Sequence, residues 1–271
     1  MHIQPKKRLG QNFLIDKNIQ QKITHACNLG SDDIVLEIGS GKGDLTVHLA
    51  KSAKKVYALE LDRRLYPVLE EKLKPFTNCR IIKADILKFD LDKFFQAEKI
   101  KQRIKVIGNI PYYISSPIIQ HLILYRNKIR QIYITVQKEF GCRVVAAPGS
   151  KNYGSFSCFV QYYLESKIIF VIKKNSFLPA PKVDSCFLSL RVREKPLVNV
   201  ADEEGFFKLI RKAFNQRRKT LRNSLEGMVR QEQLEEFFKS RSLDKNVRPE
   251  NLSLEQFADL SNFLNPVISV K

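Results

Sequence analysis

Along the first half of the chain, segments with strand-like patterns of apolar residues alternate with segments in which apolar residues recur at helical spacing. Short runs rich in Val, Ile, Leu and Tyr, bounded by charged or turn-forming residues, predict buried strands near residues 33–38, 55–61, 80–85, 104–109 and 131–137. Between these runs, apolar residues recur at helical spacing, which predicts helices that include residues 16–27, 45–51, 64–73 and 117–125. This alternation is typical of an α/β protein with a doubly wound, mostly parallel sheet and helices on both faces.

The pattern changes in the second half of the chain. Two strand-like runs at 167–173 and 185–192 are joined by the short segment KNSFLPAPKVD, which predicts an antiparallel hairpin at the sheet edge. After residue 195 the apolar positions follow helical spacing only. We therefore expect two domains, a larger α/β domain over residues 1–195 and a small helical domain over residues 196–271.

Charged and glycine residues gather where the predicted strands end. The stretch EIGSGKG follows the first strand, and its Gly39 and Gly41 allow a sharp turn and a close approach to a ligand. Glu60 ends the second strand, where a carboxylate can accept both ribose hydroxyl protons, and Asp85 ends the third, where it can accept from an adenine amine. Each acid alone could instead be solvated or cap a helix. Together they favour a cofactor that contains adenosine.

Both NAD and S-adenosylmethionine contain adenosine, so the fold alone does not choose between them. The glycine stretch lacks the third glycine of the dinucleotide motif G-x-G-x-x-G. Glu37 begins the stretch, and a carboxylate there suits a cofactor with a positive amino group better than one with a pyrophosphate. Both observations favour S-adenosylmethionine.

The fourth strand ends in GNIPYYISSP, which would be an ordinary turn if it stood alone. The side-chain carbonyl of Asn109 and the backbone carbonyl of Ile110, held by Pro111, can offer two acceptors to a planar amine, and Tyr112 can stack on the base that carries it. Two acceptors free the lone pair of an aromatic amine to attack a sulfonium methyl group. Such a reaction depends on positioning and electrostatics rather than on a strong base.

The charge balance points to a partner with many negative charges. The 271 residues include 47 Lys and Arg against 28 Asp and Glu, a net charge of +19. This surplus favours nucleic acid, although a basic soluble surface or affinity for anionic membranes are alternatives. Residues 205–225 contain no acidic residue, and they end in four cations that we expect to contact RNA phosphates: Arg217, Arg218, Lys219 and Arg222.

The remaining composition narrows the class of protein. No apolar run approaches the roughly 20 residues that a membrane-spanning helix needs, and the basic N-terminus lacks the apolar segment of a signal peptide. The 5 cysteines form no C-x-x-C pair and the 4 histidines are scattered, so we expect reduced thiols and no metal site. The expected location is the cytoplasm, with no membrane partner.

Motifs that span nearly the whole chain carry a resemblance: KKRLGQNFL, EIGSGKGDLT, ALELD, KADIL, GNIPYYISSPI, APGSKNYGSFS, FLPAPKVDS and FNQRRKTLRNSL. With these motifs the chain resembles the ribosomal RNA adenine dimethyltransferase family, most closely its small-subunit members. The resemblance implies a Rossmann-like class I methyltransferase fold that depends on S-adenosylmethionine. It also implies dimethylation of the N6 amines of adenines, two of them adjacent, in 16S rRNA, with a role in small-subunit biogenesis.

The resemblance also assigns residues. In the family, the segment that contains Asn12 and Leu14 folds over the cofactor and contacts it alongside Gly39, Glu60, Asp85 and Asn109. Asn109, Pro111 and Tyr112 match the motif that holds the target amine. Phe177 matches an aromatic residue on the other face of the target adenine. From the residues alone, Phe177 could be a core residue, whereas the P-x-P beside it favours an exposed loop.

Two positions depart from the family pattern: Ser40 stands where proline is frequent, and Tyr113 where many small-subunit members have asparagine. Large-subunit methyltransferases share NIPY, so a 23S rRNA adenine methyltransferase is an alternative. A non-catalytic ribosome assembly or RNA-binding factor of the same fold is another, and an NAD-linked reductase a further one. The basic stretch after Phe214 belongs to the small-subunit side of the family and favours the small ribosomal subunit as partner. We expect a monomer.

Overall fold

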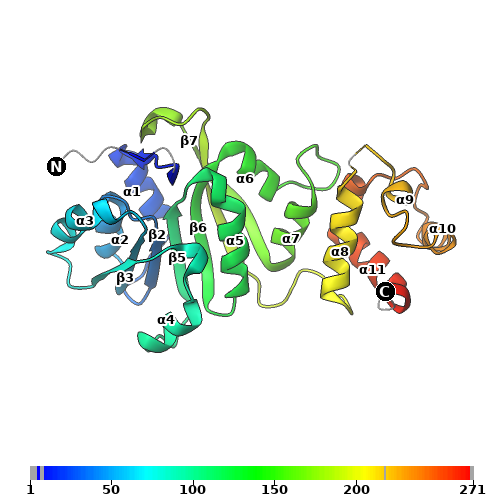
Figure 1. Cartoon of the computed structure of the whole chain (residues 1–271), viewed down its shortest axis with the longest axis horizontal. Helices are drawn as coiled ribbons and strands as arrows, with labels where there is room; N and C mark the ends of the chain where they lie inside the picture. The colour runs from blue at the N-terminus through cyan, green and yellow to red at the C-terminus, as the bar shows by residue number, and fades with distance from the viewer. Residues whose placement is uncertain (1–4, 7–8, 217, 269–271) are drawn as a thin grey trace. The chain divides into compact units, whose positions relative to one another are not determined.

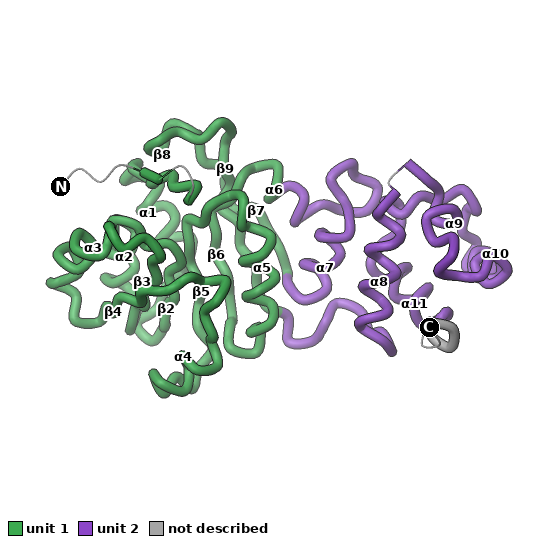
Figure 2. The backbone as a smooth tube through the Cα atoms, in the orientation of Figure 1, with its two compact units in different colours: residues 1–141, 165–192 green, residues 142–164, 193–271 purple. Residues whose placement is uncertain are grey.

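The computed structural model describes residues 5–6, 9–216 and 218–268, with residues 265–268 described for their backbone only. The chain forms two compact units, which Figure 2 shows in different colours. The first unit contains Met1–Gly141 and Glu165–Val192, and the second contains Cys142–Leu164 and Arg193–Lys271.

The first unit is built around a seven-stranded sheet with the order β4-β3-β2-β5-β6-β9-β7 (Figure 1). The neighbouring pairs from β4 to β6 are parallel, and β9 runs antiparallel to β6. The prediction of a mostly parallel α/β sheet with the two late strands at one edge is therefore confirmed. The strands are β2 Ile34–Ile38, β3 Lys55–Glu60, β4 Cys79–Lys83, β5 Ile104–Asn109, β6 Ile129–Gln137, β7 Leu164–Ile172 and β9 Ser185–Val192.

The strand order places a ligand site between β2 and β5. After β2 the chain adds β3 and β4 on one side, and it then returns to add β5 on the other side. Open α/β sheets bind ligands at such a reversal, outside the carboxyl ends of the strands. Gly108 lets β5 pack against β2 here, because a Cβ atom at this position would lie 2.8 Å from the Ile38 carbonyl oxygen.

Helices connect the strands of this unit, and acidic residues begin several of them. The Asp16 side chain accepts hydrogen bonds from the first backbone N–H groups of α1, and Asp90 does so for α4. Short 3-10 helices follow three of the strands: η2 Arg63–Leu65, η3 Ile86–Lys88 and η4 Tyr112–Ile114. The α-helices of this part of the chain are α1 Lys17–Ala26, α2 Asp44–Ala50, α3 Tyr66–Leu73, α4 Leu91–Ala97, α5 Ser115–Leu124 and α6 Lys138–Val144.

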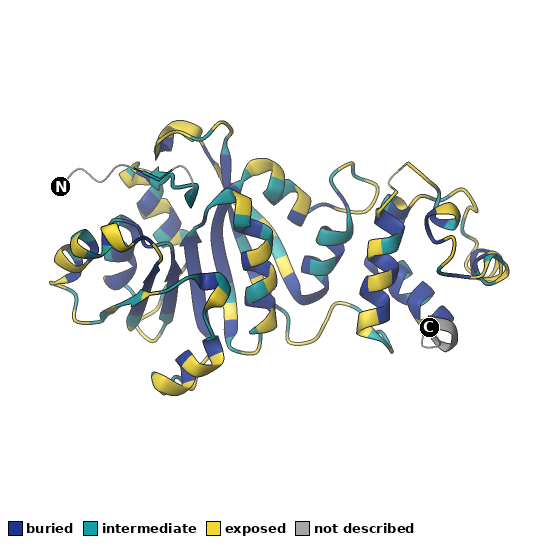
Figure 3. Cartoon of the chain, in the orientation of Figure 1, coloured by how far each residue is buried: buried dark blue, intermediate teal, exposed yellow. Residues whose placement is uncertain are grey.

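The central strands form the core, and Figure 3 shows them as the most buried part of the unit. Val35, Val106 and Ile107 have no exposed surface. Burying an aliphatic side chain of this size stabilises a fold by roughly 1.5–3 kcal/mol relative to exposure. Alternating exposure along β7, by contrast, is consistent with an edge strand that faces solvent on one side.

A second, two-stranded sheet was not predicted from the sequence. β1 (Phe13–Leu14) pairs antiparallel with β8 (Phe177–Leu178), so that Leu14 lies opposite Phe177. The 3-10 helix η5 (Lys174–Ser176) precedes β8. Two-residue strands have no detectable period, and only the tertiary fold brings these distant segments together.

The second unit is helical in its described residues. Its elements are α7 Ser155–Tyr163, α8 Glu203–Phe214, α9 Leu221–Ser224, α10 Gln231–Ser240, η6 Pro249–Asn251 and α11 Leu254–Ile268. The hydroxyls of Tyr162 and Tyr163 donate to the Glu203 carboxylate at 3.1 and 2.5 Å, and the Tyr162 ring packs against Phe206. These contacts group residues 142–164 with the C-terminal helices. The predicted division into an α/β domain over residues 1–195 and a helical domain over residues 196–271 stays a prediction.

Candidate active site

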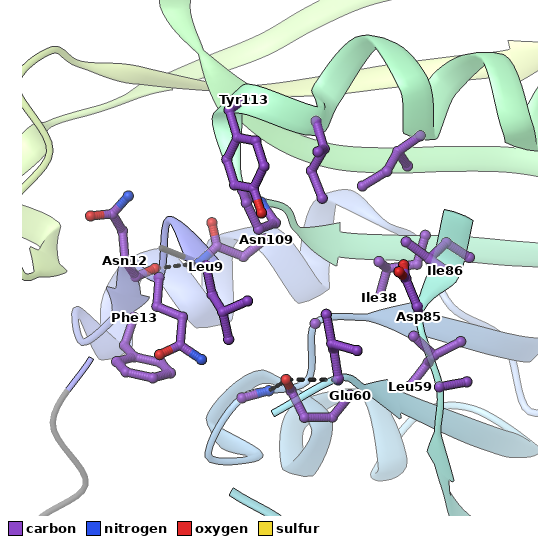
Figure 4. A pocket seen from close by; sticks show the side chains of 18 residues that line it. Leu9, Asn12, Phe13, Ile38, Leu59, Glu60, Asp85, Ile86, Asn109 and Tyr113 are labelled. Carbon is purple, nitrogen blue, oxygen red and sulfur yellow. Dashed lines mark hydrogen bonds between the residues drawn. The ribbon is translucent and has the colours of Figure 1, made fainter. Parts of the chain in front are cut away.

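One pocket of the first unit lies at the carboxyl ends of β2, β3 and β5 and just after β4, beneath the N-terminal segment. Figure 4 shows Asn12 and Phe13 on one side of this pocket, Asp85 on the other, and Asn109 between them. Hereafter we call it the first pocket. It brings together most of the predicted cofactor residues: Asn12, Gly39, Gly41, Glu60, Asp85 and Asn109. Pro111, from the predicted amine motif, also lines it.

The glycine loop between β2 and α2 needs glycine for its backbone conformation. Gly39, Gly41 and Gly43 have φ values of +72°, +60° and +81°, which other residues rarely adopt. The Gly39 N–H donates to the Leu59 carbonyl at 2.8 Å, and the Gly41 N–H donates to Glu60 Oε2 at 2.7 Å. The loop is thereby drawn onto the end of β3, beside the pocket.

Glu60 is a buried carboxylate with both oxygens engaged. Besides the bond from Gly41, Oε1 accepts from the backbone N–H groups of Leu61 at 2.9 Å and Asp62 at 2.8 Å. Burial raises the pKa of the Glu60 carboxyl, and these three N–H groups oppose the rise. A carboxylate accepts about four hydrogen bonds, so with three of them made Glu60 keeps one acceptor position, on Oε2, for a hydroxyl of a ligand.

A second pocket adjoins the first and shares Phe13, Gly39, Gly41 and Asn109 with it. Leu14 and Glu37 line this second pocket, so Leu14, which was predicted to contact the cofactor, lies here. Burial raises the pKa of the Glu37 carboxyl to about 7. The Thr46 hydroxyl donates to Glu37 Oε2 at 2.5 Å and fixes its orientation.

Asp85 and Asn109 each combine a structural contact with a free acceptor. Asp85 Oδ1 accepts from the Leu87 backbone N–H at 3.0 Å, so the side chain caps η3 while it lines the first pocket. Asn109 Nδ2 donates to the Asn12 carbonyl at 2.8 Å. Because its amide nitrogen is used in this way, the Asn109 side-chain oxygen is the atom available to a hydrogen-bond donor.

Tyr112 and Phe177, the residues predicted to stack on the target base, differ in their surroundings. The Tyr112 hydroxyl is 2.5 Å from Ser185 Oγ, and burial raises the pKa of Tyr112. Phe177 is only 2% exposed and belongs to the same core cluster as Leu14, whereas its neighbour Leu178 is 54% exposed. The expected exposed loop is therefore wrong for Phe177 itself, because successive side chains of a strand point to opposite faces. The roles of Tyr112 and Phe177 toward a target base stay predictions.

Several lining residues were not predicted from the sequence. Gln11 and Tyr113 line the first pocket, and Tyr113 is 64% exposed with its ring against Gly10. Asp62 does not line this pocket; it is 3% exposed and accepts a hydrogen bond from the Gln11 side chain. Gln11 and Asp62 each lie close in sequence to a predicted site residue, Asn12 and Glu60. The sequence pattern did not indicate that Gln11 and Asp62 contact each other.

The cations predicted to contact RNA belong to the second unit. Arg217 lies outside the described residues, and Arg218 and Lys219 are exposed. Arg222 is half-buried, and its guanidinium pairs with Glu235 at 3.0 Å and donates to Gln231 at 2.7 Å. An acid outside the basic stretch thus offsets part of its charge. The binding of RNA by this group stays a prediction.

In the part of the chain that the structure describes, no helix is long and apolar enough to cross a membrane. Among the same residues, no group of three or more His, Cys, Asp or Glu side chains is placed to bind a metal ion.

The chain is similar to known proteins over nearly its full length. A family model described as ribosomal RNA adenine dimethylase matches residues 3–266. The ribosomal RNA small subunit methyltransferase A of Geobacillus thermodenitrificans is 43% identical, covering 98% of this chain and 92% of the relative. That of Lactococcus lactis is 42% identical, covering 97% and 90%.

Solved structures show the same fold. A dimethyladenosine transferase from Plasmodium falciparum has a TM-score of 0.77 at 26% identity, covering 94% of this chain and 98% of that one. The 23S rRNA methyltransferase ErmE has a TM-score of 0.74 at 26% identity, covering 94% and 100%. Because a protein named as a 23S rRNA methyltransferase shares this fold, the fold alone does not identify the ribosomal RNA substrate.

Proposed function

The chain belongs to the ribosomal RNA adenine dimethylase family, and from this premise we propose that it dimethylates the N6 amines of adenines in small-subunit 16S rRNA. It is an enzyme, and S-adenosylmethionine is its methyl donor. The observation that carries the proposal is the meeting of Glu60, Asp85 and Asn109, from three strand ends, in one pocket. Relatives at 42–43% identity that are named for the small subunit favour it over the 23S rRNA alternative.

The residues of the two pockets fit the cofactor. The first offers Glu60 to a ribose hydroxyl and Asp85 to an adenine amine, with apolar side chains such as Ile38 and Leu59 beside them. The second places the buried Glu37 carboxylate where it can bind an ammonium group. When bound, S-adenosylmethionine supplies a methyl group on a positively charged sulfur. Asn109 lines both pockets, which supports a reacting methyl group near it.

The amine of the target adenine is held by acceptors of this chain. Asn109 offers its side-chain oxygen, fixed by the bond from its Nδ2 to Asn12, and the Ile110 carbonyl precedes Pro111, whose φ is −60°. Acceptors on both amine hydrogens localise the nitrogen lone pair and direct it toward the methyl group. The product ammonium is acidic enough to release its proton to water, so these residues need not act as a base. In the second round one N–H remains, and one acceptor suffices.

The non-catalytic alternative is disfavoured by the intact set of cofactor and amine-binding residues. An assembly role could coexist with catalysis. RNA binding is supported by the net charge of +19 and by the exposed Arg218 and Lys219. We further propose action in the cytoplasm, as a monomer, on a small ribosomal subunit.

The test is transfer of labelled methyl groups to purified, unmodified small and large ribosomal subunits. We expect label only in small-subunit RNA, recovered as dimethyladenine. Asn109→Ala should lower the rate by roughly 10²–10³-fold, as for removal of a hydrogen-bonding group from a reacting centre, while it still binds the subunit. Label in the large subunit alone, or wild-type turnover by the variant, would contradict the proposal.

A further inference from the structure

The N-terminal strap, defined here as residues 9–14, is held against the first pocket at several points. Its Leu14 pairs with Phe177, and its Asn12 carbonyl accepts from Asn109 Nδ2 at 2.8 Å. Just before them, Gln11 Nε2 donates to Asp62 Oδ2 at 3.0 Å. The strap supplies part of the pocket lining, so its position determines whether the pocket is closed.

Asp62 anchors the strap at Gln11. Its side chain is 1% exposed, and it accepts from Arg64 Nη2 at 2.7 Å and Arg64 Nε at 3.1 Å in addition to Gln11. Lys6, just before the strap, places Nζ 3.4 Å from Asp62 and donates its backbone N–H to Gln11 Oε1 at 2.8 Å. The Arg64 guanidinium, with help from Gln11 and Lys6, holds the pKa of the Asp62 carboxyl well below its usual range. The anchor is therefore ionised at every physiological pH.

The same residue belongs to the turn that orients Glu60. The Asp62 backbone N–H donates to Glu60 Oε1 at 2.8 Å, and the Leu61 N–H donates to that oxygen at 2.9 Å. The Asp62 side chain also caps η2, because it accepts from the Arg64 backbone N–H at 3.3 Å. Asp62 thus holds the strap through its buried carboxylate and holds Glu60 through its backbone N–H.

We propose that Asp62 is a positioning residue for the cofactor: through Gln11 it latches the strap over the pocket, and through its own turn it orients Glu60. Asp62 itself does not line the pocket, whereas Gln11, Leu61 and Glu60 do. The latch acts on cofactor binding, since it closes the pocket around whatever occupies it. The separate strap contact from Asn109 Nδ2 to the Asn12 carbonyl, which orients the acceptor of the target amine, does not involve Asp62 or the Gln11 side chain. The inference rests on the proposed function only in the identity of the cofactor.

Three changes test the latch: Gln11→Ala, Asp62→Asn, and Asp62→Asn combined with Gln11→Glu. The first two remove a hydrogen bond to a charged group, which corresponds to roughly a 10- to 100-fold rise in the Kd for S-adenosylmethionine. The combined variant exchanges the amide and the carboxylate, so the bond can form again and the Kd should return toward the wild-type value. Asp92→Asn is the matched control, because Asp92 pairs with Lys128 at 2.5 Å on the surface and lies outside the pocket.

The measurements are calorimetric binding of S-adenosylmethionine without RNA, and KM and kcat for methyl transfer to small subunits. We expect the Kd and KM to rise in the single variants while kcat at saturating cofactor stays within about twofold of wild type, because neither variant alters the Asn12–Asn109 hydrogen bond that orients the amine acceptor. A loss of general stability would not be reversed by the exchange. Should Asp62→Asn fail to fold, Gln11→Ala decides alone, because its side chain lies on the strap.

An unchanged Kd in Gln11→Ala, or a combined variant no better than Asp62→Asn, would overturn the latch. A drop in kcat with no change in Kd would overturn it too. Failure of the proposed function gives a different result: the wild-type protein would bind S-adenosylmethionine with the expected latch dependence and yet label no small-subunit RNA.

Discussion

Glu37 carries a prediction that links stability to function. Its side chain is 2% exposed at the end of β2, and burial raises the pKa of its carboxyl from 4.5 to about 7. Nearby Glu60 and Asp44 raise it further, while hydrogen bonds from Thr46 and Ser40 oppose the rise. In the unfolded chain the carboxyl is solvated and ionises near its ordinary value. The folded protein therefore holds this proton more tightly than the unfolded chain does.

The sign and the size follow from this difference. A raised folded pKa stabilises the protein fully below the unfolded pKa, and that stabilisation is lost as the pH rises through about 7. A shift from 4.5 to about 7 corresponds to about 3 kcal/mol of stability lost at high pH. Glu37→Gln keeps an oxygen that accepts from Thr46 but cannot ionise. Relative to wild type, the variant should therefore gain about 2 kcal/mol in free energy of unfolding between pH 5.5 and pH 8.5.

Urea unfolding of both proteins without cofactor, followed by circular dichroism across this pH range, measures the difference. Glu98→Gln is a control, because a hydrogen bond from the Tyr57 hydroxyl lowers the pKa of Glu98. The pKa of Glu98 then lies below pH 5.5 in both the folded and the unfolded protein. The difference in free energy of unfolding between Glu98→Gln and wild type should therefore not change between pH 5.5 and pH 8.5. If the difference in free energy of unfolding between Glu37→Gln and wild type were also independent of pH, the reasoning would be refuted. The same variant should bind S-adenosylmethionine more weakly despite its added stability, because it lacks the carboxylate proposed to bind the ammonium group.

Two further predictions concern packing and RNA. Gly108→Ala should lower the free energy of unfolding by about 1–3 kcal/mol in urea titrations, since the new Cβ would lie 2.8 Å from the Ile38 carbonyl oxygen; wild-type stability would contradict the close packing of β5 on β2. Replacing Arg218, Lys219 and Arg222 with glutamine should weaken small-subunit binding while the Kd for S-adenosylmethionine stays constant. The slope of log K against log salt should become shallower by about 2–3, at roughly 0.7–0.9 per phosphate contact. An unchanged salt slope would show that these three residues do not contact RNA.

The cofactor residues at strand ends were predictable because a short-range pattern locates them. Apolar runs locate the strands, and parallel strands that share one sheet bring their carboxyl ends to the same edge. Glu60, Asp85 and Asn109 each lie at or just after such an end, so their meeting in one pocket follows from the strand pattern alone. Family resemblance then identified the reaction, which the fold by itself leaves open.

Contacts between distant segments were decided by the tertiary structure. Gln11 and Asp62 are 51 positions apart, and neither residue belongs to a periodic pattern that would pair them. Phe177 is buried because β8 pairs with a two-residue strand near the N-terminus. Arg222 is partly neutralised by Glu235 from another helix. The sequence by itself thus determined the strand ends, where local spacing suffices, whereas the latch, the buried ring and the ion pair depend on how the chain folds back on itself.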